Sequence, residues 1–206
     1  MIAVIDYGRG NLGSVEKAFR RVGIPAVITQ DPRSVDEAEA VVLPGDGAFH
    51  DAMSNLDQLG LLPAVRRSLD GSRPVLGICL GYQLLFSTSE EFGEGRGLDV
   101  VPGAVRRLPR GQKIPHMGWN RVEHGGDLRL FDGIPSGAHF YFVHSFYPVP
   151  QSGSMPLKVA WCEYGVRFAA AIEVRRIHAT QFHPEKSQRW GLRMLENFAA
   201  IVKSGR

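Results

Sequence analysis

Cys79 lies in a run of residues that is typical of a tight strand-to-helix turn carrying a nucleophile. The run reads Gly-Ile-Cys-Leu-Gly over 77–81 and follows an apolar stretch that begins at Pro74. Such a turn needs small residues two before and two after the nucleophile, because larger side chains would collide with the neighbouring backbone. It would hold the thiol above the carboxyl edge of a sheet, where the N-terminus of the following helix favours the thiolate. The pattern predicts a nucleophilic cysteine, although a lone cysteine is more often a small buried side chain.

A histidine and a carboxylate with complementary chemistry follow a late apolar stretch. His183 and Glu185 are two residues apart in Gln-Phe-His-Pro-Glu-Lys over 181–186. We expect both to lie at a strand end and face one side, so that His183 serves as base and then as acid while Glu185 fixes its tautomer. A histidine buried for structural reasons is the alternative, but it would leave both polar groups unexplained. The other cysteine, Cys162, has no such turn around it and is expected in the core or a loop.

A glycine-rich turn near the N-terminus is a competing site. The segment 8–13 reads Gly-Arg-Gly-Asn-Leu-Gly, the spacing of a dinucleotide fingerprint, and Asp31 lies where such proteins bind the ribose. Two further residues separate the preceding strand from the first glycine, and Arg9 and Asn11 are bulky where the cofactor should approach. We favour a structural turn between strand and helix, and keep a dinucleotide-binding module at Gly8–Gly13 as an alternative.

The elements that would position these residues alternate in the first half of the chain. Short apolar runs predict strands buried on both faces, and helical spacing between them predicts covering helices. Period-two alternation from about 98 to 182 predicts antiparallel strands that extend the same sheet. The fold class is therefore a single α/β domain over 1–206, with a mostly parallel sheet flanked by helices. The expected early strands are 2–5, 26–29, 40–43 and 74–78, a late strand is 177–182, and the expected helices are 12–22, 61–69 and one that begins near Ser187.

Composition and charge limit the partners and cofactors. The 206 residues are 44% hydrophobic and 22% charged, which is typical of a globular protein. The 24 Lys and Arg against 21 Asp and Glu give a net charge of +3 in scattered basic pairs, so we expect no nucleic-acid partner. The N-terminus lacks a signal peptide and no apolar run is long enough for a bilayer, which predicts a cytoplasmic protein without membrane contact. The histidines form no cluster with cysteine spacing, so neither a metal nor a cofactor is expected.

The two catalytic motifs together resemble those of the class I, or triad-type, glutamine amidotransferases. The resemblance rests on Gly-Ile-Cys-Leu-Gly-Tyr-Gln over 77–83 and His-Pro-Glu over 183–185, and it covers essentially the whole chain. It implies hydrolysis of glutamine to glutamate and ammonia, with Cys79, His183 and Glu185 as the catalytic residues. Further matching segments are 5–12, 43–49, 115–120, 141–145 and 181–187.

Within that family, the full length is most similar to the glutaminase subunits that serve histidine biosynthesis. The resemblance implies a heterodimer with the cyclase subunit of imidazole glycerol phosphate synthase. Ammonia would reach the cyclase through an internal tunnel and be used to make imidazole glycerol phosphate and an aminoimidazole carboxamide ribotide. The isolated subunit is expected to be weakly active until partner and cyclase ligand bind. A glutaminase subunit of another synthase stays open as an alternative.

Three groups of residues match family positions with roles beyond the triad. The implied oxyanion and substrate-binding loop residues are Gly45, Asp46, Gly47 and Leu80. The implied ligands of the glutamine are Gln83, Ser145 and Phe146. The implied interface and activation residues are Asn11, Trp119, Tyr141 and Lys186. Aromatic residues in strands usually belong to a core, which is the alternative for Trp119 and Tyr141.

Asp46 stands where the family often has valine, close to the expected chemistry. A carboxylate about 4 Å from a developing oxyanion would cost roughly 4 kcal/mol at an effective dielectric near 20. We therefore expect its side chain to point away from Cys79, towards solvent or a cation, with only the backbone N–H aimed at the substrate. The glycines on both sides make this arrangement sterically easy.

Overall fold

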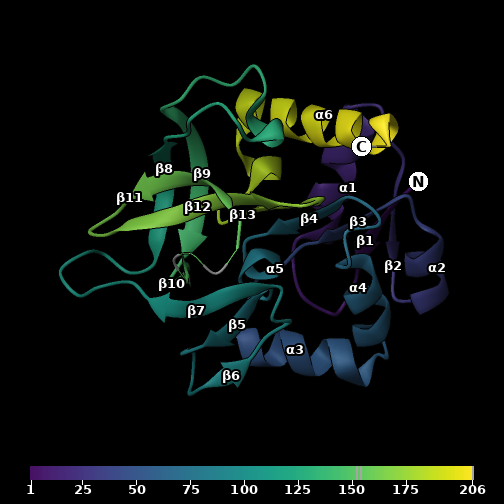
Figure 1. Ribbon diagram of the computed structural model, residues 1–206, viewed down its shortest axis with the longest axis horizontal. Helices are drawn as coiled ribbons and strands as arrows, with labels where there is room; N and C mark the ends of the chain where they lie inside the picture. Colours follow the sequence, from purple (N-terminus) through teal and green to yellow (C-terminus); the bar gives the residue numbers. More distant parts are fainter. Residues whose placement is uncertain (152, 154, 206) are drawn as a thin grey trace.

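A seven-stranded sheet runs through the centre of the computed structural model, which describes residues 1–151, 153 and 155–205 (Figure 1). Side by side, its strands are β11 (Lys158–Glu163), β12 (Arg167–Val174), β13 (Ile177–Thr180), β4 (Val75–Ile78), β3 (Ala40–Leu43), β1 (Ile2–Ile5) and β2 (Ala26–Thr29). The strands from β13 to β2 are mutually parallel, and β12 and β11 add antiparallel pairs at one end. The α/β fold with a mostly parallel sheet and an antiparallel extension is confirmed.

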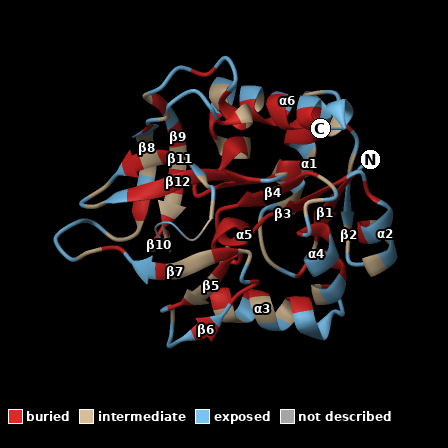
Figure 2. Ribbon diagram, viewed as in Figure 1, coloured by how far each residue is buried: buried red, intermediate tan, exposed pale blue. Residues whose placement is uncertain are grey.

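Helices cover both faces of this sheet and create two cores. One face carries α1 (Leu12–Arg21) and α6 (Gln188–Ser204), and the other carries α2 (Pro32–Glu37), α3 (Phe49–Gln58) and α4 (Leu62–Ser68) (Figures 1 and 2). Successive side chains of a strand point to opposite faces, so Val42 lies in the core under α1 and α6 and Val41 in the other. The predicted burial of β1, β3 and β4 on both faces is confirmed, because every residue of these strands is buried.

The predicted helix ends follow from the residue types at their boundaries. Asn11 accepts a hydrogen bond from the Ser14 backbone N–H (3.3 Å) at the start of α1. Gly23, just beyond the end of α1, has a φ of +77°, which glycine adopts without strain. The structure also has α2 and α3, which we did not predict. No helix in the described part of the chain has the length and apolar character that a bilayer crossing requires.

Two predictions about the strands are wrong. β2 is not buried on both faces: it is the last strand of the sheet, and Val27 and Ile28 are 44% and 37% exposed. Of the strands predicted from about 98 to 182, those between residues 101 and 150 do not extend the central sheet but belong to two smaller ones, because alternation fixes which face of a strand is buried and not which edge it pairs with. The strands of the smaller sheets are β10 (Phe146–Pro150), β7 (Val101–Arg107), β5 (Phe86–Ser89) and β6 (Gly95–Arg96) in one sheet, and β8 (His116–Val122) and β9 (Ala138–His144) in the other.

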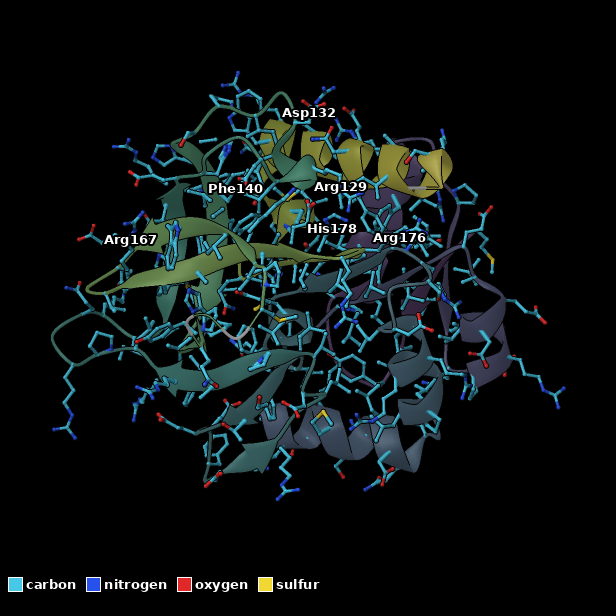
Figure 3. The ribbon with its side chains drawn as sticks, in the orientation of Figure 1. Arg129, Asp132, Phe140, Arg167, Arg176 and His178 are labelled. Carbon is cyan, nitrogen blue, oxygen red and sulfur yellow. The ribbon has the colours of Figure 1, made fainter. Side chains whose placement is uncertain are left out.

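Glu173 on β12 is a buried carboxylate that gathers cationic and polar side chains around it. It accepts hydrogen bonds from the Arg129 backbone N–H (2.8 Å), the Arg129 guanidinium (3.1 Å) and Lys158 Nζ (3.3 Å). His178 Nδ1 lies 3.4 Å from the carboxylate, and Figure 3 shows Arg129 and His178 close together below α6. Burial raises the pKa of Glu173, but the adjacent His178 ring and the hydrogen bond and charge of Arg129 outweigh it and lower the pKa to about 2.

We expect Glu173→Gln to lower the free energy of unfolding at pH 7. A carboxyl whose pKa falls from 4.5 to about 2 on folding stabilises the folded state by about 3 kcal/mol. Since the folded-state pKa is the lower one, this contribution is complete above the unfolded pKa and is lost as the pH falls towards the folded one. Urea denaturation at pH 7 and pH 3 should show the difference from wild type shrinking to roughly half at pH 3.

The matched control for Glu173→Gln is Glu163→Gln, which removes an exposed carboxylate from the neighbouring strand β11. Exposed charges contribute at most about 1 kcal/mol, so the control should change stability little. Equal stabilities for Glu173→Gln and wild type at both pH values would contradict the account of this cluster.

Candidate active site

Cys79 occupies the sharp turn between β4 and the short helix α5 (Leu80–Gln83). Its φ of 53° and ψ of −103° are unusual for a residue with a side chain, as expected of a strained nucleophile turn. The glycines on each side are required by their surroundings. A Cβ at Gly77 would lie 3.1 Å from the Gly81 carbonyl oxygen, and a Cβ at Gly81 would overlap the carbonyl oxygen of Leu43. The predicted turn and its steric reason are confirmed, although α5 is only one turn long.

His183 and Glu185 come together at the same edge of the sheet as Cys79. β13 pairs in parallel with β4, so the carboxyl ends of both strands lie side by side. His183 follows β13 and precedes the short 3-10 turn η2 (Pro184–Lys186), so the pair lies in a turn and not in the strand itself. His183 Nδ1 lies 2.8 Å from Glu185 Oε1, and both side chains are 2% exposed. The predicted pairing is therefore confirmed.

The protonation chemistry of His183 follows from this pairing. Because a carboxylate accepts at Nδ1, that nitrogen carries the hydrogen and Nε2 is the nitrogen available to a reacting group. Nε2 is buried and makes no hydrogen bond to any residue that the structure describes. Burial lowers the pKa of His183, but negative charge on nearby Cys79 and Glu185 outweighs burial and raises the pKa to about 10. The imidazolium is thus stabilised, and it is the form that can protonate a leaving amine.

The loop between β3 and α3 approaches the turn that carries Cys79. A side chain at Gly45 would overlap the Tyr7 hydroxyl and press on Leu80, so only glycine fits there. The Leu80 N–H donates to the Gly45 carbonyl oxygen (3.4 Å). The N–H of a trans peptide points away from its carbonyl, so the Asp46 N–H points away from Leu80. One implied oxyanion donor is thus engaged by the loop, and a second is turned outward.

Asp46 does not point away from the chemistry as we expected. Its Oδ1 lies 3.8 Å from His183 Nε2, and its side chain is 42% exposed. The cation that we expected beside Asp46 is the His183 imidazolium, because the pKa of His183 is raised. Electrostatic attraction therefore favours the carboxylate facing the pocket.

A cavity of about 420 Å³ opens over Cys79 and gathers most of the residues implied by the family resemblance. The implied residues that line it are Asp46, Gly47, Cys79, Leu80, Gln83, Ser145, Phe146 and Lys186. Sequence reasoning missed Glu91, Pro115, Val143 and His144, which line it as well. The adjacent Phe92-Gly93 turn signals a loop near Glu91, but no motif marks the carboxylate as part of a site.

The polar groups of the cavity are fixed by internal hydrogen bonds. Gln83 Nε2 donates to the Phe146 carbonyl (2.9 Å) and to Gln181 Oε1 (3.2 Å). With both amide hydrogens engaged, the carbonyl oxygen is the part of the Gln83 side chain left to accept a hydrogen bond from a ligand in the cavity that this residue lines. The Glu91 carboxylate accepts from the Phe49 N–H (2.7 Å) and adds negative charge at the rim. These acceptors suit a ligand that carries an ammonium or amide group.

The implied interface residues lie outside this cavity, except for Lys186. Trp119 on β8 faces Tyr141 on β9, and their ring centroids are 6.1 Å apart. Trp119 is 47% exposed and Met117 beside it is 61% exposed, so this pair of strands presents an apolar face and Trp119 is not a core residue. Asn11 caps α1 and does not line the cavity.

The glycine-rich turn over 8–13 is explained without a dinucleotide. A Cβ at Gly10 would lie 3.4 Å from the backbone of Gly45, so the turn packs against the loop beside Cys79. Arg9 forms an ion pair with Asp51 (2.7 Å), and Asp31 caps α2 by accepting from the Arg33 N–H (3.0 Å). The groups that would bind a pyrophosphate and a ribose therefore have structural roles. Among the described residues, no group of three or more His, Cys, Asp or Glu is arranged to hold a metal ion.

A cysteine on a strand-to-helix turn, with a paired histidine and glutamate just beyond the end of the neighbouring parallel strand, is the arrangement expected of an α/β protein with a cysteine-type triad. A family model, glutamine amidotransferase class-I, matches residues 3–202, and the chain belongs to this family.

Relatives in this family cover nearly the whole chain. Imidazole glycerol phosphate synthase subunit HisH of Moorella thermoacetica is 53% identical over 98% of this chain and 95% of its own length. The proteins of the same name from Geobacter sulfurreducens and Aquifex aeolicus are 51% and 50% identical, over 97% and 95% of this chain and 98% and 94% of their own lengths.

Solved structures have the same fold at low sequence identity. A crystal structure of a glutamine amidotransferase has a TM-score of 0.74 at 20% identity, and the match covers 98% of this chain and 100% of that one.

Proposed function

We propose that this chain is the glutaminase subunit of an imidazole glycerol phosphate synthase, a single-domain cytoplasmic protein that supplies ammonia to a cyclase subunit. The observation that carries the proposal is an assembled Cys79, His183 and Glu185 site in a chain about half identical, over nearly its full length, to proteins named as subunit HisH of that synthase. Both cysteines are free thiols, which suits a reducing compartment. A glutaminase subunit of another synthase is disfavoured, because the full-length identity is to this subunit.

The reaction follows from the three side chains. The Cys79 thiolate attacks the side-chain amide carbon of glutamine and forms a C–S bond, and charge develops on the amide oxygen. His183 donates its Nε2 proton to the amide nitrogen, the C–N bond breaks, and ammonia leaves a thioester. His183 then takes a proton from water, which attacks the thioester and releases glutamate and the thiolate. Glu185 holds the imidazole in the correct tautomer throughout.

The cavity suits the two ends of glutamine. The Gln83 carbonyl oxygen and the Glu91 carboxylate would accept hydrogen bonds from its amino group, which extends the site to a residue that sequence reasoning missed. The backbone around Ser145 and Phe146 would hold the chain of the substrate above Cys79.

The loop at Gly45 supplies a reason for dependence on a partner. While the Gly45 carbonyl accepts from Leu80, neither the Leu80 N–H nor the Asp46 N–H is free to bind the oxyanion. Rotation of this peptide would release both donors, and the flanking glycines leave room for it. Docking that favours the rotated state would activate the enzyme by shifting this equilibrium.

The exposed apolar face of β8 and β9 is the proposed docking surface for the cyclase. Trp119 and Met117 are large exposed apolar side chains there, and Tyr141 is paired with Trp119 across the two strands, with their rings edge to face. Lys186 lines the cavity and directly follows Glu185 in the chain. Contact of a partner with Lys186 would therefore displace the segment that holds His183 and Glu185.

The test is a glutaminase assay on the full chain alone and after co-purification with the cyclase subunit of the same organism. Cyclase ligand should raise glutamine turnover of the complex at least about tenfold over the free chain, since couplings of 1–3 kcal/mol are typical. Amide nitrogen from 15N-labelled glutamine should enter the cyclised product even in excess unlabelled ammonium. Equal turnover for the free chain and the liganded complex, or no transfer of label, would overturn the proposal.

We expect Asp46→Val to change the chemical step of the fully activated complex by no more than about tenfold, or roughly 1.4 kcal/mol. The Asp46 carboxylate lies 3.8 Å from His183 Nε2, but its side chain is 42% exposed, so water screens its charge and only the backbone N–H of this residue is proposed to bind the oxyanion. Single-turnover kinetics on saturated complex measure this step. Asp51→Asn, which removes an exposed carboxylate paired with Arg9, is the control. A change well beyond tenfold would show that the Asp46 carboxylate acts on the reacting centre.

A further inference from the structure

Two buried histidines next to the cavity, His116 and His144, are used by none of the steps above. We infer that they are positioning residues for glutamine: they form a hydrogen-bonded relay that fixes the Phe146 carbonyl and, through it, the orientation of the Gln83 amide. The inference rests on the proposed glutaminase function, and it assigns a role to His144, which lines the cavity, and to His116, which does not.

The relay joins the two strands that lie behind the cavity. His116 begins β8 and His144 ends β9, and the two residues are paired in the sheet. His116 Nδ1 lies 2.9 Å from His144 Nε2, and His144 Nδ1 lies 2.9 Å from the Phe146 carbonyl oxygen. At the other end, Asn120 Nδ2 lies 3.2 Å from His116 Nε2 and also donates to the Glu163 carbonyl (3.0 Å). The rings of His116 and His144 are 3% and 6% exposed.

Only one arrangement of hydrogens satisfies every bond of the relay. A carbonyl oxygen can only accept, so His144 carries its hydrogen on Nδ1 and its Nε2 accepts. His116 must then donate from Nδ1 and accept at Nε2, where the Asn120 amide supplies the hydrogen. Both imidazoles are neutral, and a proton added to either would place two N–H groups against each other. Burial lowers the pKa of His116 to about 4 and that of His144 to about 3, and a proton on one ring would further disfavour a proton on the other.

The relay ends on a group that orients a substrate ligand. The Phe146 carbonyl accepts from His144 and from Gln83 Nε2 (2.9 Å) at the same time. Gln83 also donates to Gln181, whose own Nε2 lies 3.6 Å from the Cys79 sulfur. If the Phe146 carbonyl shifted, the Gln83 amide could turn and present its NH2 group to the amino group of the substrate. Two donors would then face each other, and binding of glutamine would weaken.

Packing alone does not require histidine at position 116. Its ring stacks between Tyr164 (centroids 3.9 Å apart, planes at 16°) and Phe142 (4.8 Å and 21°). A phenylalanine ring would fill the same aromatic stack but could make neither hydrogen bond. The polar ring atoms are therefore the feature to be explained, and the relay explains both nitrogens of both rings.

The first test compares variants of His116 in the chain assembled with its cyclase partner and cyclase ligand. His116→Phe should raise KM for glutamine about tenfold or more and leave kcat within about threefold, because it removes positioning and no reacting group. His116→Asn should restore KM to within about threefold of wild type, since its Nδ2 can donate where His116 Nδ1 does. Tyr164→Leu, which removes the stacking partner and keeps the relay, should lower Tm without changing KM. An unchanged KM in His116→Phe, or an equal rise in KM in Tyr164→Leu, would overturn the inference.

The second test measures the hydrogen positions of the relay by NMR and needs no activity measurement. In 15N spectra of the full chain, His144 should carry its hydrogen on Nδ1 in both wild type and His116→Phe, and its Nε2 resonance should shift in His116→Phe because that nitrogen loses the hydrogen that His116 donates. A hydrogen on His144 Nε2 in wild type would overturn the relay directly. The two tests also separate the two proposals. An inactive wild-type complex contradicts the proposed function. An active complex in which His116→Phe leaves KM for glutamine unchanged contradicts the relay alone.

Discussion

Replacing Cys79 with alanine should reduce glutamine hydrolysis by the assembled complex at least about 10⁴-fold, because loss of the nucleophile removes the covalent route altogether. The cyclase reaction with added ammonium should continue at the wild-type rate, since the two chemistries occupy separate subunits. Both rates can be measured on one preparation, with glutamine or with ammonium as the nitrogen source.

The matched control is Cys162→Ala. Cys162 is also a buried free thiol, but burial raises its pKa to about 12 and it lies on β11, away from the cavity. Glutaminase activity should therefore be retained in this variant. Substantial activity in Cys79→Ala, or loss of the ammonium-dependent reaction with it, would contradict the assignment of the nucleophile.

Replacing His183 with alanine should be nearly as damaging, with a loss of about 10⁴-fold in kcat/KM, because the leaving ammonia and the attacking water both exchange protons with this ring. Glu185→Ala should cost roughly 10 to 100 times less than His183→Ala, since an orienting group contributes less than the base it orients. Steady-state kinetics of the three enzymes in the activated complex measure the order.

His50→Ala is a control for the loss of a histidine outside the site. The His50 ring forms a hydrogen bond with the Gly93 carbonyl oxygen (3.2 Å), and His50 does not line the cavity. It should retain wild-type activity. A Glu185→Ala enzyme less active than His183→Ala would contradict the roles given to the pair.

The parts of the site that depend on local geometry could be predicted from the sequence. Gly77 and Gly81 mark the turn around Cys79 because a Cβ at either position would meet backbone. His183 and Glu185 are only two residues apart, so their pairing is set locally. The start of α1 is also determined locally, because the Asn11 side chain caps its own helix.

The parts that depend on long-range packing could not be predicted. The split of the later strands into two small sheets depends on which strand edges pair. Hydrophobic alternation carries no information about that pairing. Glu91 reaches the cavity from a loop that no motif marks, and His144 reaches it from the end of β9 although its segment, 141–145, was matched only as a whole. Asp46 faces His183 because of a charge that exists only once the triad is assembled.

Helix α3 is a different case, because its pattern is visible in the sequence. Phe49, Ala52 and Leu56 recur at helical spacing and are buried on one face. The segment lacks a capping side chain at its start, where Ala48 stands, so the usual signal of a helix N-terminus is missing.

The central claim is that Cys79 is the nucleophile of a glutamine-specific site. It is tested most directly by treating the activated complex with the chloroketone analogue of glutamine and mapping the adduct by mass spectrometry. The account predicts one adduct per chain, located on Cys79, formed in step with the loss of glutaminase activity and prevented by excess glutamine. Inactivation with the adduct on Cys162 or on any other residue, or labelling of Cys79 that glutamine does not prevent, would contradict it.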